Sequence, residues 1–138
     1  MLKHGLTGLA ATFMLTLPSS AQDAATVELP DICTAAMPHD MGSMGSMDME
    51  MHGMPASHQD LAKGMPQFNA RMMQGMAAED IDVAFVCAMI PHHQGAISMA
   101  RAELEHGDDE WARAMASKVI EAQEKEIGEM LAWLKEQK

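Results

Sequence analysis

The C-terminal part of the chain, residues 80–135, repeats apolar side chains at helical spacing and is interrupted once, at Gly107-Asp108. Asp80 or Asp82 can cap the start of the first helix, and Gly107 suits its end. Because the connection is so short, the two helices must run antiparallel as a hairpin. The predicted buried stripes are Val83, Val86, Cys87, Ile90, Ile97 and Leu104 on the first helix, and Trp111, Met115, Val119, Ala122, Ile127, Met130, Leu131 and Leu134 on the second.

A further helix is predicted before this hairpin, from about Ser57 to Met76, with a later start near Pro66 as the alternative. Its apolar face would be formed by Leu61, Met65, Phe68, Met72 and Met76, whose methionines are interpreted as core because they share the stripe with Leu61 and Phe68. No sustained strand pattern occurs, so the predicted fold class is all-α, an antiparallel helical bundle. A four-helix arrangement would need a helix from the preceding segment or a second chain, which leaves a homodimer open.

The first 21 residues are typical of a secretory signal peptide. Lys3 supplies a positive start, an apolar run covers residues 5–17, and small residues precede a cleavage site near Ala21. The run is too short for a membrane span, which needs about 20 residues. The sequence therefore predicts export to the periplasm, with no membrane insertion after cleavage.

The net charge and the two cysteines limit the kinds of partner that the exported chain can bind. A formal net charge of −11 disfavours nucleic acid and anionic membranes and favours cations. Cys33 and Cys87 are the only cysteines. A disulfide is the favoured interpretation in an oxidising compartment, and a pair of thiolate metal ligands is the rival one.

Residues 37–54, MPHDMGSMGSMDMEMHGM, have a composition that no packed core needs. Glycine, serine and acids separate the methionines, so residues 22–57 are predicted to form a flexible arm before a bundle domain at 58–138. Thioether sulfur is a soft ligand that suits Cu(I) or Ag(I). The candidate ligands of the arm and its boundary are Met37, His39, Met41, Met44, Met47, Met49, Met51, His52, Met54 and His58. The imidazoles of the histidines among them also provide some binding of Cu(II).

A second group of candidate ligands lies on the hairpin. Met89, His92 and Met99 fall on one helical stripe, and His93 lies about 100° further round. On the second helix Gln123, Glu126 and Met130 recur at three- and four-residue spacing. In one interpretation the histidines and methionines bind a metal, with Gln123 or Glu126 orienting an imidazole. In the other, the same polar groups form a hydrogen-bonded network that holds the hairpin in register.

Two further features of the first hairpin helix have a structural interpretation. Pro91 lacks an N–H, so the Cys87 carbonyl is predicted to lose its helical donor. Glu103 and His106 form a Glu-x-x-His pair, but a di-iron bundle needs two such pairs and two more glutamates. The pair is therefore interpreted as solvated surface.

The hairpin resembles the CopM-like family of exported bacterial copper-binding proteins. The residues that carry the resemblance run from Phe85 to Ala100, as FVCAMIPHHQGAISMA, and continue at Gln123, Glu126-Ile127, Met130 and Trp133-Leu134. The resemblance implies a ferritin-like helical bundle and a role in periplasmic copper binding, tolerance or handover. Residues 37–54 lie outside it.

The leading hypothesis is a periplasmic copper chaperone or buffer that is not an enzyme. It would bind Cu(I) or silver through methionine, bind Cu(I) or Cu(II) through histidine, and hand copper to another periplasmic protein. One alternative is a metal-dependent oxidase or reductase using His92 and His93, which lacks a complete di-iron set. The other is a metal-indifferent helical interaction module.

Overall fold

The computed structural model describes residues 27–34 and 53–137. They form a short 3-10 helix, η1 (Asp31–Cys33), and four α-helices: α1 (Ala56–Leu61), α2 (Met65–Gly75), α3 (Ile81–His106) and α4 (Glu110–Leu134). No strand occurs within these two ranges, so the predicted all-α class is confirmed for them. The predicted signal peptide and the candidate ligands from Met37 to His52 lie outside the described residues.

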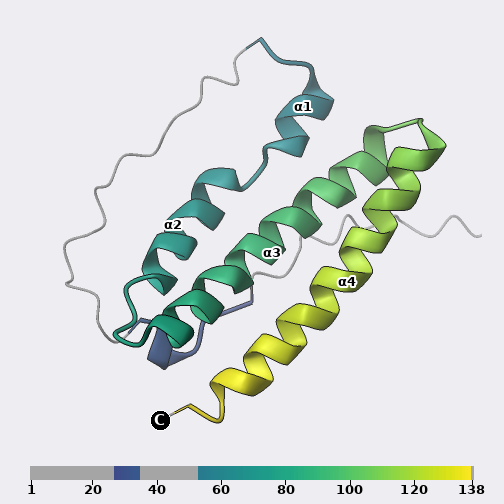
Figure 1. Cartoon of the computed structure of the whole chain (residues 1–138). Helices are drawn as coiled ribbons and strands as arrows, with labels where there is room; N and C mark the ends of the chain where they lie inside the picture. The colour runs from purple at the N-terminus through teal and green to yellow at the C-terminus, as the bar shows by residue number, and fades with distance from the viewer. Residues whose placement is uncertain (1–26, 35–52, 138) are drawn as a thin grey trace, which may run out of the picture.

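The long helix α3 is the centre of the arrangement (Figure 1). α4 packs along one side of it, and α1 and α2 pack along the other. None of the helices in the described part of the chain is long and apolar enough to cross a membrane.

The bounds and caps of the α3–α4 hairpin follow the sequence prediction, but Trp111 and Met115, predicted to be buried on α4, are 71% and 43% exposed, and Ala122 is exposed as well. Asp80 caps α3, where its carboxylate accepts hydrogen bonds from the N–H groups of Asp82 at 2.9 Å and Val83 at 3.1 Å. Asp109 caps α4 in the same way, accepting from the Ala112 N–H at 2.8 Å. The two helices run antiparallel, which confirms the predicted hairpin (Figure 1).

The single helix predicted from Ser57 to Met76 is wrong, because the chain forms two helices separated by a turn at residues 62–64. Gly64 has a φ of +80°, a left-handed conformation that favours glycine, and Pro66 lies in the first turn of α2. The alternative start near Pro66 therefore describes α2 well. Leu61 and Met76, predicted to be buried, are 37% and 52% exposed because they lie at the outer ends of this broken stripe.

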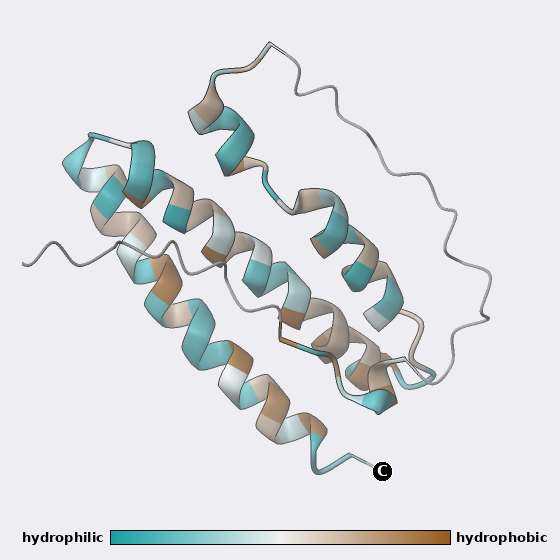
Figure 2. Ribbon diagram, turned by 180° about the vertical axis from the view of Figure 1, so that it is seen from behind, coloured by the Kyte–Doolittle hydropathy of each residue, from teal (hydrophilic) through white to brown (hydrophobic). Residues whose placement is uncertain are grey.

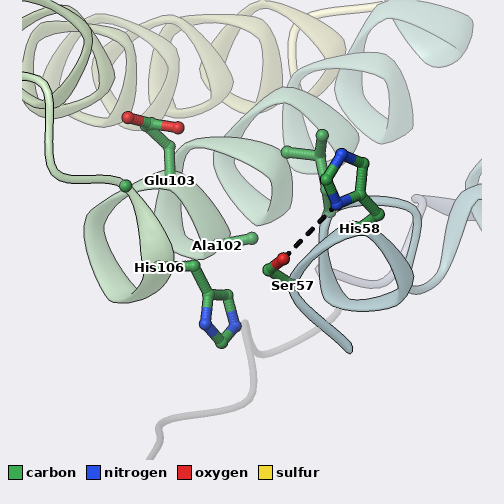
Figure 3. Close-up of a pocket in the computed structure, with 7 residues that line it drawn as sticks. Ser57, His58, Ala102, Glu103 and His106 are labelled. Atoms are coloured by element: carbon green, nitrogen blue, oxygen red, sulfur yellow. Dashed lines mark hydrogen bonds between the residues drawn. The ribbon is translucent and has the colours of Figure 1, made fainter. Parts of the chain in front are cut away.

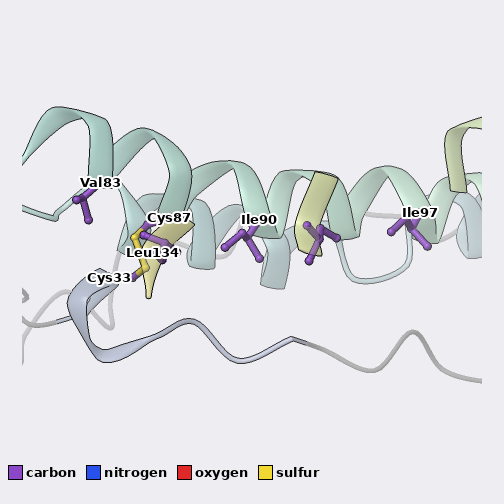
Figure 4. Packing of buried hydrophobic residues seen from close by; sticks show 7 residues of the cluster. Cys33, Val83, Cys87, Ile90, Ile97 and Leu134 are labelled. Atoms are coloured by element: carbon purple, nitrogen blue, oxygen red, sulfur yellow. A yellow bond between two sulfur atoms is a disulfide. The ribbon is translucent and has the colours of Figure 1, made fainter. Parts of the chain in front are cut away.

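The core runs along one face of α3 and includes residues far away in sequence (Figure 4). Its buried members are Cys33, Val83, Cys87, Ile90, Ile97, Ile127 and Leu134. A disulfide joins Cys33 to Cys87, with 5.5 Å between their Cα atoms, so in this structure the two cysteines are not thiolate ligands.

Residues 27–34 fall within the predicted arm, yet they belong to the packed structure. Val27, Leu29 and Ile32 pack against the core cluster, and Arg71 of α2 donates a hydrogen bond to the Val27 carbonyl. The segment lies across the face of the helices seen in Figure 2. The disulfide therefore attaches this short, partly apolar segment to α3, and the segment covers one side of the core.

The contact between α2 and α3 depends on a glycine and a proline. Pro91 is fully buried inside α3 and has no N–H to donate to the Cys87 carbonyl. Gly75, the last residue of α2, lies against this carbonyl, since a Cβ atom added there would be 2.6 Å from the Cys87 oxygen. Glycine lets the end of α2 reach the irregular part of the α3 backbone.

Candidate functional site

A buried histidine connects the two long helices at the α3–α4 seam. His93 of α3 is only 6% exposed, and its Nε2 atom lies 2.6 Å from Oε2 of Glu126 on α4. The Glu126 side chain is half exposed, so the carboxylate reaches the imidazole from the surface. The Nδ1 atom of His93 is buried and has no hydrogen-bond partner among the described residues.

This arrangement leaves one nitrogen of His93 available for a ligand. When Nε2–H donates to a carboxylate, the neutral ring carries its lone pair on Nδ1. A buried polar atom without a partner is unfavourable, and such atoms usually have a specific reason. Carboxylate–histidine pairs of this kind orient imidazoles that bind metal ions through the other nitrogen.

The His93–Glu126 contact also fixes which methionines face each other. In an antiparallel pair, the residue one turn before the contact on α3 lies opposite the residue one turn after the contact on α4. Met89 and Met130 occupy these positions, and both are half-buried. Helical geometry therefore predicts that these two methionines lie opposite each other, one turn from the His93–Glu126 pair.

The other predicted ligands on α3 lie away from the seam. His92 is exposed, with its ring centroid 5.9 Å from that of His93 and an angle of 62° between the ring planes. Met99 is also exposed. Gln123 is half-buried on α4, one turn before Glu126, and makes no hydrogen bond to either histidine in the described structure. The two adjacent histidines do not converge on one point.

A metal site at the seam would have to include sulfur. Within residues 27–34 and 53–137, no three histidine, cysteine, aspartate or glutamate side chains lie close enough to hold a metal ion. Met54 and His58, the candidate ligands at the end of the predicted arm that the structure describes, are exposed and precede or lie on α1. They are separate from the seam in sequence, because Met54 lies before α1 and His58 lies on it.

The charges on α4 beside the seam are exposed. Lys125 donates a hydrogen bond to Glu129, and this bond, with the charge of Glu129, raises the pKa of Lys125 above its ordinary value. Glu126 contributes less to the same shift. Because Lys125 is at the surface, solvent screens its positive charge. The strongly acidic chain as a whole still favours cations.

A second polar group lies where α1 meets the end of α3 (Figure 3). His106 Nε2 is 2.8 Å from Asp60 Oδ2, and a pocket of about 230 Å³ beside them is lined by Ser57, His58, Leu61, Ala102, Glu103, His106 and Gly107. Sequence reasoning identified His106 but not Asp60, since 46 positions separate them. His106 is at the surface, as expected, but it is held by α1.

These observations define a small all-helical protein, with an internal disulfide and a histidine–carboxylate pair between its two long helices. The model of a family described as a domain of unknown function, DUF305, matches residues 14–134, and the chain belongs to this family. A comparison with curated proteins gives no match. Membership of DUF305 is compatible with the resemblance to CopM-like proteins, and the family description says nothing about metals.

Proposed function

We propose that this protein is an exported copper-binding protein that buffers Cu(I) in the periplasm or hands it to another copper protein. It acts without catalysing a reaction, and silver would bind to the same soft ligands. The observation that carries the proposal is the α3–α4 seam, where His93 is oriented by Glu126 and has an unpartnered Nδ1 atom. Helical spacing predicts that Met89 and Met130 lie one turn from this pair, and thioether with imidazole is a ligand set that suits Cu(I).

The proposal assigns a second role to residues 37–54. Seven methionines in these 18 positions provide soft donors whose binding needs no deprotonation, unlike that of thiolates or imidazoles. Both flanks of the segment belong to the described structure, through the disulfide of Cys33 on one side and α1 on the other. We propose that this segment loads copper and that the seam retains it.

The ferritin-like bundle implied by the resemblance belongs to the same proposal. A four-helix bundle needs four long helices, whereas the four helices of the described residues have 26, 25, 11 and 6 residues. α4 has only three buried residues, and Phe85 and Trp111 are largely exposed. A second copy of the chain could supply the missing helices, and light scattering at the dimer mass would support that arrangement.

The test is a titration of the mature chain with Cu(I) and with Ag(I) against a competing chelator. Replacing Met89 and Met130 by leucine removes both seam sulfurs at nearly constant volume. The matched control replaces two exposed methionines outside the seam, Met73 and Met115, by leucine. We expect the seam variant to lose one tightly bound ion and the control to keep the full stoichiometry.

A chain lacking residues 37–52 separates the two roles. This deletion should remove most of the remaining capacity for Ag(I) while leaving the ion at the seam. Equal stoichiometry in the wild type, the seam variant and the deletion would contradict the proposed function. Circular dichroism checks that each variant keeps its helices.

A further inference from the structure

We infer that the open face of the α3–α4 hairpin binds a second copy of this chain, with the α3 helices of the two copies antiparallel about a two-fold axis. A four-helix bundle needs long helices that one chain lacks, and this inference gives the second copy a definite face and orientation. It rests on the packing of the helices and holds with or without copper.

The helices α2, α3 and α4 lie side by side in one layer, with α3 in the middle (Figure 1, Figure 2). Residues 27–34 cross the face seen in Figure 2, whereas no described segment crosses the α3–α4 hairpin on the face seen in Figure 1. Cys87 is bonded to the covering segment, and Phe85 lies about 160° round α3 from it. Domains are built from at least two packed layers, so the face that carries Phe85 lacks its second layer.

Both long helices carry a mostly apolar stripe on this open face, with residues at three- and four-residue spacing. The stripes consist of Ile81, Phe85, Met89, His92, Ala96 and Met99 on α3, and of Met115, Val119, Ala122, Glu126, Met130 and Trp133 on α4. Phe85 is 62% exposed and Met99 is 41% exposed. Because Glu126 contacts His93, which follows His92, the two stripes border the same side of the seam. Together they form one surface along the hairpin.

The α3 stripe matches itself when it is reversed. Phe85 and Met99 each lie two helical turns from His92, on opposite sides of it. Antiparallel pairing of two α3 helices centred on His92 therefore places Phe85 of each copy opposite Met99 of the other. Methionine sulfur makes favourable contacts with aromatic rings. A two-fold symmetric interface requires this reciprocity, since each contact occurs twice with the copies exchanged.

The α4 stripe reverses about its own centre, Glu126. Val119 and Trp133 each lie two turns from it, so antiparallel α4 helices place each of them opposite the other. The centres of the two stripes lie at the same level of the hairpin, because His93, next to His92, has its Nε2 atom 2.6 Å from Glu126 Oε2. One two-fold axis therefore fits both helices, which identifies a second copy as the partner.

The area and charge of the face also suit a second copy. α3 has 26 residues and is about 39 Å long, and two helices side by side are about 20 Å wide, so the face covers about 800 Å². Stable interfaces bury about 800 Å² per partner. A chain with a net charge of −11 repels its own copy, yet Glu126 is the only carboxylate in the two stripes. Its contact with His93 directs that carboxylate toward its own seam.

Sedimentation of the mature chain with a chelator present measures the dimer and its dissociation constant. The wild type should sediment at the dimer mass at micromolar concentrations. Phe85→Glu should weaken the dimer by roughly thirtyfold or more, the loss found at central contacts, and symmetry makes the change act twice. The matched control is Met73→Glu, because Met73 is 56% exposed and lies about 160° round α2 from Gly75, which contacts α3. This control should dimerise as the wild type does.

Cross-linking tests the orientation of the two copies even if a charged variant is unstable. In the double variant Phe85→Cys with Met99→Cys, the new cysteines of one chain are about 21 Å apart along α3, too far for a disulfide. Mild oxidation should therefore join two copies into a covalent dimer. Phe85→Cys alone should not do so, because the two copies of this residue lie at opposite ends of the interface.

A monomeric wild type at micromolar concentrations would overturn the inference. So would equal dimerisation of Phe85→Glu and Met73→Glu, or cross-linking of Phe85→Cys alone as fast as that of the double variant. The masses and the Ag(I) titration give separate results. A dimer that binds no Ag(I) would contradict the proposed function alone, whereas a monomer that binds Ag(I) would contradict this inference alone.

Discussion

The Cys33–Cys87 disulfide should account for a large part of the stability of this small protein. The bridge closes a loop across 54 positions, so on the chain-entropy model it stabilises the fold by about 4 kcal/mol. Domains of this size have a total stability of roughly 5–15 kcal/mol. Replacing both cysteines by alanine should therefore leave a weakly stable or unfolded bundle.

Urea unfolding followed by circular dichroism measures this effect. With a urea m value of roughly 1–3 kcal/mol/M, the midpoint should fall by about 1–4 M. A reducing agent should lower the urea midpoint of the wild type by a similar amount and leave that of the double variant unchanged. The Leu29→Ala variant keeps the disulfide but removes an apolar contact of residues 27–34, so it measures the contribution of their packing to stability apart from that of the cross-link. A loss below about 1 kcal/mol in the double variant would refute the loop-closure reasoning.

Three other changes test the packing of the helices. Gly75→Ala should destabilise the protein by about 1–3 kcal/mol in urea unfolding, because the added Cβ would meet the α3 backbone. Gly128→Ala should stabilise it by about 0.5–1 kcal/mol, because a Cβ there meets nothing within 4 Å. Asp80→Ala should cost about 1 kcal/mol by removing the α3 cap, and an unchanged midpoint would contradict that role. Arg71→Leu should speed amide exchange in residues 27–34, since it removes the donor to the Val27 carbonyl; unchanged exchange would show that this bond does not hold the segment.

The sequence was sufficient to predict the long helices, because their signals are local. Asp80 and Asp109 cap helices whose apolar spacing continues for many turns, and Gly107 marks the connection between them. The break at Gly64 was harder to place, because a methionine-rich stripe continues across it and matches one helix as well as two. Composition also failed to predict that residues 27–34 pack against the core, because they do so through only a few apolar side chains.

The candidate sites were predictable only in part, because they depend on contacts between helices. Periodicity put His92 on a stripe with Met89 and Met99 and left His93 about 100° further round, so it could not decide that His93 is the histidine that meets Glu126. The register that brings Met89 opposite Met130 follows only once that contact is known. No local pattern connects Asp60 with His106, since only the way α1 folds back along α3 brings them together.

X-ray absorption at the copper edge of the Cu(I)-loaded mature chain tests the central claim most directly. The account predicts that copper remains bound after desalting and that its first shell contains thioether sulfur together with imidazole nitrogen. Replacing Met89 and Met130 by leucine should lower the sulfur contribution, whereas replacing Met73 and Met115 should not. Loss of the copper on desalting, or a first shell of nitrogen and oxygen alone, would contradict the account.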